Sequence, residues 1–201
     1  MIKAIIFDFG NVISTFDNDL FIARIDAYSN FNTEELHNLI YEESGLTDLY
    51  ERGEISSNEL FEEISKLCNL SMPIDKFRIA YGDIFTPIPT TIDLVKKLKQ
   101  KYKIALLSNT SEWDFEIGIE ACEVFDLFDA VTLSHVVGVK KPGQEIYNDS
   151  LGKLGLKPEE CVYIDDIKEY ADKAKELGIH GIHYKSQDGL MGSLKALGII
   201  V

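Results

Sequence analysis

Polar side chains of several kinds follow the apolar segments of this 201-residue sequence, at the points where those segments end. They comprise three carboxylates, a hydroxyl, an amide and a cation, at Asp8, Ser108, Asn109, Lys141, Asp165 and Asp166. The carboxyl ends of parallel strands meet at one rim of an open α/β sheet, where such sheets bind ligands. We therefore expect these residues to share one site.

The predicted site contains the groups that phosphoryl transfer through an aspartyl-phosphate requires. A carboxylate such as Asp8 attacks phosphorus once the phosphate charge is neutralised. Mg²⁺ is usually held by one or two carboxylates, which Asp165 and Asp166 supply. Lys141 and the Ser108 hydroxyl are suited to hold the equatorial phosphate oxygens. Taken singly, each residue also fits a plain structural role, because turn-capping acids, acids at helix N-termini and solvated lysines are common.

The composition excludes some partners and compartments. Thirty-four acidic and 20 basic residues give a net charge of −14, and no basic stripe is present to neutralise nucleic-acid phosphates. Three scattered cysteines predict free thiols in a reducing compartment. The chain starts with a strand pattern, and no apolar stretch approaches the roughly 18 residues of a membrane span. We expect a soluble cytoplasmic protein that binds a phosphorylated small molecule, without nucleic acid or membrane; the oligomeric state stays open.

Alternating strands and helices must position the site. Apolar runs suited to strands buried on both faces cover 2–7, 103–107, 130–133, 161–164 and 181–184. Helices are predicted at 90–101 (with a capped N-terminus), 113–122, 144–154, 168–177 and 188–197. This alternation predicts an α/β fold with a doubly wound parallel sheet and right-handed crossovers.

A helical insertion separates the first strand from the rest of the sheet. The stretch 13–86 reads as helices without a convincing strand, and it ends at a proline-rich link. Two reciprocal helix caps are expected in it, at Asn32 with Glu35 and at Ser56 with Glu59. The stretch is long for a crossover and suits a small helical domain inserted into a loop.

Four motifs resemble those of the haloacid dehalogenase-like (HAD) hydrolase superfamily, in the same order and at matching intervals along nearly the whole chain. They lie at 5–12 (IIFDFGNV), 107–109 (LSN), 138–142 (GVKKP) with 146–147 (IY), and 164–166 (IDD). The resemblance implies a Rossmann-like catalytic core of 1–14 and 88–201 with a helical cap of 15–87. The segment 51–56 (ERGEIS) and the Asp-x-Gly-Asn form of the first motif resemble the subgroup that contains sugar-1-phosphate phosphatases.

The resemblance implies a Mg²⁺-dependent phosphomonoester hydrolase that acts through an aspartyl-phosphate, with sugar phosphates among its candidate substrates. Asp8 would be the nucleophile, and Lys141, the lysine next to proline, would bridge it to the phosphate. Ser108 and the backbone beside it at Asn109 would bind the phosphate.

The resemblance also implies a metal site at the same rim. Asp166 would bind Mg²⁺ directly, and Asp165 would hold a metal-bound water. Asp8 and the backbone carbonyl of Gly10 would provide further ligands.

Two positions depart from the superfamily pattern. Its phosphatases usually carry a second Asp two residues after the nucleophile, which protonates the leaving group; here that position is Gly10. Because such help is worth roughly 10²- to 10⁴-fold, three explanations stay open: substrates with good leaving groups, a proton donor in 14–17 or in the cap, or a residual activity. Tyr170 stands four residues after Asp166, where Asn or Asp is usual.

Two other functions stay open at this point. The absence of a side chain at Gly10 is compatible with a non-catalytic phosphate-ligand binder or regulatory protein. A haloacid dehalogenase-type hydrolase would also act through Asp8 but without a metal, and that branch carries Tyr where Gly10 stands here.

Overall fold

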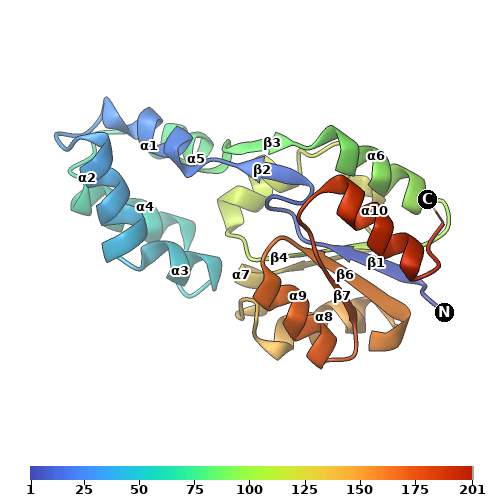
Figure 1. Ribbon diagram of the computed structural model, residues 1–201. Coiled ribbons are helices and arrows are strands. Elements are labelled where there is room, and N and C mark those ends of the chain that lie inside the picture. The colour runs from blue at the N-terminus through green and yellow to red at the C-terminus, as the bar shows by residue number, and fades with distance from the viewer. Residues whose placement is uncertain (201) are drawn as a thin grey trace.

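The computed structural model describes residues 1–200 and is built on a five-stranded, entirely parallel sheet with helices on both faces (Figure 1). The strands are β1 (Ala4–Phe7), β4 (Lys103–Ser108), β5 (Ala130–Leu133), β6 (Cys161–Asp165) and β7 (His180–His183). Their order is β5-β4-β1-β6-β7, so the first strand is central. The predicted doubly wound α/β fold is confirmed.

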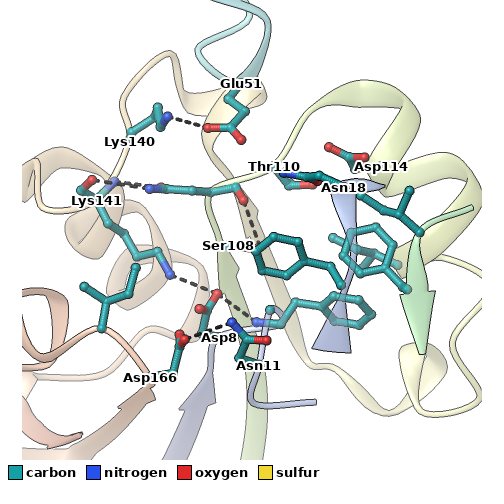
Figure 2. A pocket seen from close by; sticks show the side chains of 18 of the residues that line it. Asp8, Asn11, Asn18, Glu51, Ser108, Thr110, Asp114, Lys140, Lys141 and Asp166 are labelled. Carbon is teal, nitrogen blue, oxygen red and sulfur yellow. Dashed lines mark hydrogen bonds and ion pairs between the residues drawn. The ribbon is translucent and has the colours of Figure 1, made fainter. Parts of the chain in front are cut away.

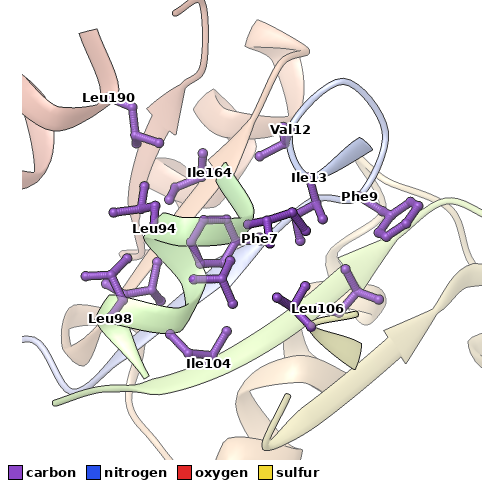
Figure 3. Packing of buried hydrophobic residues seen from close by; sticks show 14 of the residues in the cluster. Phe7, Phe9, Val12, Ile13, Leu94, Leu98, Ile104, Leu106, Ile164 and Leu190 are labelled. Atoms are coloured by element: carbon purple, nitrogen blue, oxygen red, sulfur yellow. The ribbon is translucent and has the colours of Figure 1, made fainter. Parts of the chain in front are cut away.

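Alternation along the strands determines which helices cover each face. The long core helices are α6 (Pro89–Leu98), α8 (Gln144–Leu154), α9 (Lys168–Glu176) and α10 (Gln187–Ala196). Successive strand side chains point to opposite faces, and so Ile5 and Phe7 pack with α6 and α10 (Figure 3). Ala4 and Ile6 pack with α8 and α9 on the other face. The run around β1 is continuously apolar because both of its faces are buried.

Six further helical segments occur between β1 and β4 in the sequence, and in space they lie to one side of the sheet (Figure 1). They are α1 (Asn18–Asp26), α2 (Thr33–His37), η1 (Asn38–Glu43), α3 (Leu46–Glu51), α4 (Ser57–Leu67) and α5 (Ile74–Gly82). These segments bury their own hydrophobic cluster, which Trp113 of the core joins. Both predicted reciprocal caps are present, at the starts of α2 and α4.

The prediction that the insertion contains no strand is wrong. β2 (Ser14–Phe16) pairs with β3 (Phe85–Pro87) as an antiparallel ribbon between the sheet and the helical segments. Each strand has only three residues, too few to show an alternating pattern, and the partners are far apart in the chain. The ribbon falls on the predicted boundary between core and cap, and that boundary stays a prediction.

Smaller differences arise where elements are short or irregular. The helix predicted at 113–122 is π-helical over η2 (Asp114–Ile119). The helix predicted at 90–101 is α6, which starts at Pro89 and has no side-chain cap, contrary to the prediction; Pro suits the first helical position because it has no N–H to be capped. The short segments α7 (Ser134–Val137), η3 (Phe125–Leu127) and η4 (Pro158–Glu160) were not predicted. The three cysteines are buried and free. Among residues 1–200, every helix is too short or too polar to cross a bilayer.

Candidate active site

The ends of three adjacent strands bring the predicted polar residues together. Asp8 directly follows β1, and its backbone N–H donates to the Ile164 carbonyl of β6 at 2.9 Å. On the other side of β1, β4 ends in Ser108, which also lines the cavity beneath the helical segments. Asp8, Asp165 and Asp166 each offer a carboxylate oxygen, and these oxygens lie within 4.8 Å of one another. Parallel pairing with a shared register thus converts distant sequence positions into one carboxylate cluster.

Lys141 enters this cluster from the loop before α8. Its Nζ lies 2.9 Å from Asp8 Oδ1 and 2.8 Å from Asp165 Oδ2, and its side chain is buried (Figure 2). The ammonium of Lys141 lies over the ring of Tyr170, 5.1 Å from the ring centroid, in a cation–π contact. Tyr170 is the second residue that departs from the superfamily pattern. Tyr163 donates to Asp165, which also accepts the Ile167 N–H at 2.8 Å. Asp165 therefore holds Lys141 in place.

Burial dominates the electrostatics of the cluster. It raises the pKa of Asp8 to about 7, with a further rise from the charge of Asp165, and Lys141 opposes both effects. Burial alone would lower the pKa of Lys141, but the two adjacent carboxylates outweigh it and raise that pKa above its ordinary value. The cluster contains three carboxylates and one ammonium, which pairs with two of them, so it attracts a further cation.

The amide of Asn109 joins two loops of the site. Its Oδ1 accepts the Lys141 backbone N–H at 2.7 Å, and its Nδ2 donates to the Lys141 carbonyl at 3.3 Å. Asn11 makes a similar link at the carboxylate cluster, where its Nδ2 donates to Asp166 Oδ2 at 3.1 Å. Asn11 has a left-handed backbone with φ of 53°, a conformation that asparagine tolerates better than most residues. The sequence placed Asn11 in the Asp-x-Gly-Asn motif but assigned its side chain no role.

A cavity of about 290 Å³ lies above the cluster, near the lower end of the range for small-molecule pockets. The predicted residues Asp8, Gly10, Ser108, Asn109, Lys141 and Asp166 line it, whereas Asp165 lies beneath. The helical segments and η2 close its far side with residues that sequence reasoning missed: Asn18, Tyr41, Thr47, Glu51, Tyr81 and Asp114. No motif marks these positions, except that Glu51 opens the ERGEIS segment.

The ERGEIS segment lies against the core. Ser134 Oγ of α7 donates to the Glu51 carbonyl at 2.6 Å, and Lys140 pairs with the Glu51 carboxylate and with Asp48 at 2.8 Å. Gly53 has a φ of +67°, and a Cβ there would lie 2.2 Å from the His135 carbonyl oxygen. Only glycine fits this approach without moving the backbone. These contacts hold the helical segments over the cavity.

Gly10 has an aromatic neighbour where the superfamily usually places its second acid. A Cβ at Gly10 would lie 3.2 Å from Cε1 of Phe16, a β2 residue that lines the cavity. The ring of Phe85 on β3 packs near the ring of Phe16, and the centroids of these two rings are 6.4 Å apart. The position therefore faces an apolar wall.

Asp114 is a second buried acid of the cavity. Burial, and then the charge of Glu51, raises its pKa to about 7, although Ser111 hydrogen-bonds it and opposes the shift. Burial, and then the charge of Asp114, raises the pKa of Tyr41 and of Tyr81, which line the same cavity. The charged groups that shift the pKa of Asp114 include no cation.

Asp114→Asn is expected to change how stability depends on pH. The pKa of Asp114 in the folded protein, about 7, lies above its ordinary value of 3.8. Between these values the folded state keeps a proton that the unfolded chain releases, so this residue lowers stability as pH rises through that window. The variant should gain stability relative to wild type between about pH 5 and about pH 8. Urea midpoints at both values measure this, and a pH-independent difference would contradict it.

The fold and the site define an α/β protein with a carboxylate site beneath a helical insertion. Residues 2–178 match the family model of the haloacid dehalogenase-like hydrolases. The chain belongs to this family.

Relatives and a solved structure agree with that assignment. The D-ribitol-5-phosphate phosphatase of Bacteroides thetaiotaomicron is 27% identical over 187 residues, covering 89% of each chain. The phosphorylated carbohydrates phosphatase of Thermotoga maritima is 26% identical, covering 93% of this chain and 88% of its own. A HAD family enzyme of Bacteroides thetaiotaomicron, solved with magnesium and inorganic phosphate, superposes with a TM-score of 0.80 at 24% identity, covering 93% and 96%. The last similarity concerns the fold.

Proposed function

We propose that this enzyme is a Mg²⁺-dependent phosphomonoesterase that hydrolyses small phosphorylated metabolites through an aspartyl-phosphate on Asp8. The observation that carries the proposal is the carboxylate cluster, in which Lys141 bridges Asp8 and Asp165 at 2.9 and 2.8 Å. Two relatives named as phosphatases of phosphorylated polyols or carbohydrates support the reaction class.

The donor set fits Mg²⁺. Asp8 and Asp166 supply hard carboxylate oxygens at the cavity wall, and the Gly10 carbonyl is a third candidate ligand there. When bound, the ion would neutralise phosphate charge and polarise a phosphoryl oxygen. Asp165 Oδ2 accepts from Lys141, whereas Oδ1 accepts the Ile167 N–H and can accept a second hydrogen bond, so we assign Asp165 to positioning Lys141 and, as the sequence predicted, to holding a metal-bound water.

The residues at the rim account for both halves of the reaction. An Asp8 oxygen attacks phosphorus, and the bond from phosphorus to the leaving oxygen breaks as the new bond forms. The Lys141 ammonium and the Ser108 hydroxyl hold phosphoryl oxygens as their charge develops. Water then cleaves the aspartyl-phosphate, which releases inorganic phosphate and restores the Asp8 carboxylate. Because Gly10 and Phe16 provide no proton donor, esters whose leaving oxygen needs little protonation should react best.

Phosphate release from p-nitrophenyl phosphate and a panel of sugar phosphates tests the proposal. With Mg²⁺ we expect turnover of both classes, and chelation with EDTA should reduce it by on the order of 10²-fold or more, because several kcal/mol of charge stabilisation disappear. Excess Mg²⁺ should restore the rate.

Two outcomes would overturn the proposal. If no ester releases phosphate in the presence of Mg²⁺, the result would favour a non-catalytic protein that binds a phosphate ligand. Halide release from a 2-haloacid that persists in EDTA would favour dehalogenation through the same Asp8.

A further inference from the structure

Asp114 lies across the cavity from Asp8 (Figure 2). It is 8% exposed and begins η2. Its Oδ2 accepts from Ser111 Oγ at 2.7 Å, whereas Oδ1 is buried and, among residues 1–200, has no hydrogen-bond partner. The contact with Ser111 therefore uses one oxygen only. A buried carboxylate oxygen without a donor costs free energy, and so a donor brought by a ligand would stabilise this arrangement.

The cations of the cavity wall are already paired. Lys141 pairs with Asp8 and Asp165, and Lys140 pairs with Asp48 and Glu51. Within the part of the chain that the structure describes, the cavity wall contains no arginine or histidine. The half of the cavity under the helical segments thus offers carboxylates without a free cation. A leaving group that carries its own carboxylate or second phosphate would meet like charge there.

Neutral hydrogen-bonding groups line the cavity together with Asp114. Tyr41 of η1 and Tyr81 of α5 line the same cavity, as do Asn18 and Thr47. Burial, followed by the charge of Asp114, raises the pKa of both tyrosines, so both keep their hydroxyl protons at neutral pH. Hydroxyl groups both donate and accept, and several on one small molecule would satisfy such a wall better than an apolar chain.

We propose that Asp114, with Glu51 and the hydroxyls of Tyr41 and Tyr81, binds hydroxyl groups of the leaving group, so that the enzyme selects phosphate esters of neutral polyhydroxylated compounds. The inference rests on the proposed phosphatase activity and adds its substrate class and a specificity-determining residue. Asp114 acts on the part of the substrate remote from phosphorus.

Matched esters separate this role from a catalytic one. A pentitol 5-phosphate, the corresponding aldonate 5-phosphate and pentyl phosphate are all alkyl esters of similar length, and they differ in hydroxyl groups and charge. Wild type should turn over the pentitol ester with the highest kcat/KM of the three. At about pH 8, where the ionised form of Asp114 predominates, Asp114→Asn should lower that value by about 10- to 100-fold, the range for hydrogen bonds to a charged group. Pentyl phosphate and p-nitrophenyl phosphate should change by no more than about twofold, since neither places a hydroxyl against the residue.

Two further variants guard against misfolding and against a general effect. Tyr41→Phe removes one hydroxyl and should reproduce the selectivity loss at a smaller scale. Glu120→Gln, an exposed change just after η2, should leave all four rates unchanged. Thermal unfolding of each variant reports whether it folds.

Distinct results overturn the inference and the function on which it rests. An equal loss on all four esters in folded Asp114→Asn, or no preference of wild type for the pentitol ester, overturns the inference while phosphatase activity stands. If wild type with Mg²⁺ releases no phosphate even from p-nitrophenyl phosphate, the proposed function fails, and this inference fails with it.

Discussion

Replacing Asp8 by asparagine is expected to abolish phosphate release, with kcat falling by on the order of 10⁴-fold or more, as when other covalent nucleophiles are removed. The amide has nearly the shape of the carboxylate but is a very poor nucleophile. Lys141 keeps Asp165 at 2.8 Å in the variant, so the buried ammonium still has a counter-ion and the fold should persist. Phosphate release from p-nitrophenyl phosphate with Mg²⁺ is the direct measurement.

The matched control for this prediction is Asp26→Asn. Asp26 is exposed at the end of α1, so the same chemical change there should leave kcat unchanged. Mass spectrometry of acid-quenched protein adds a second readout, because a phosphorylated form should accumulate in wild type and be absent from Asp8→Asn. Turnover by Asp8→Asn within tenfold of wild type would remove Asp8 from the nucleophile's role.

The rim of the sheet was predictable because its signals are local. An apolar run that stops at Asp8, or at Asp165, marks both the strand and its end, and parallel pairing does the rest. The reciprocal caps at Asn32 and Ser56 were predictable for the same reason, since each is complete within four residues.

The far side of the cavity was not predictable, because long-range packing creates it. Tyr41, Tyr81 and Asp114 come from three different elements, and each could equally be a core or capping residue in sequence. Phe16 shows the same limit at shorter range. The sequence shows that Gly10 lacks an acidic side chain, but only the pairing of β2 with β3 places an aromatic ring beside that position.

Lys141→Met is expected to cost both activity and stability, because it removes the ammonium that pairs with Asp8 and Asp165. Without it Asp8 and Asp165 would face each other uncompensated, and breaking a buried ion pair from one side typically costs about 3–5 kcal/mol of unfolding free energy. Urea unfolding in EDTA measures this loss. Phosphate release should fall by about 10²- to 10³-fold, as for the loss of one preorganised charge-stabilising group.

Mg²⁺ distinguishes electrostatic relief from simple loss of packing in this variant. If the carboxylates hold the ion as proposed, it should replace part of the missing positive charge, and saturating Mg²⁺ should stabilise Lys141→Met more than wild type. Lys140→Met is the control, because that lysine pairs with Asp48 and Glu51 at the edge of the cavity. Its loss should cost about 1 kcal/mol or less, as for partly exposed pairs, and should leave the response to Mg²⁺ unchanged. Equal stabilisation of Lys141→Met and wild type by Mg²⁺ would mean that the ion does not bind among these carboxylates, and the metal site would have to be sought elsewhere.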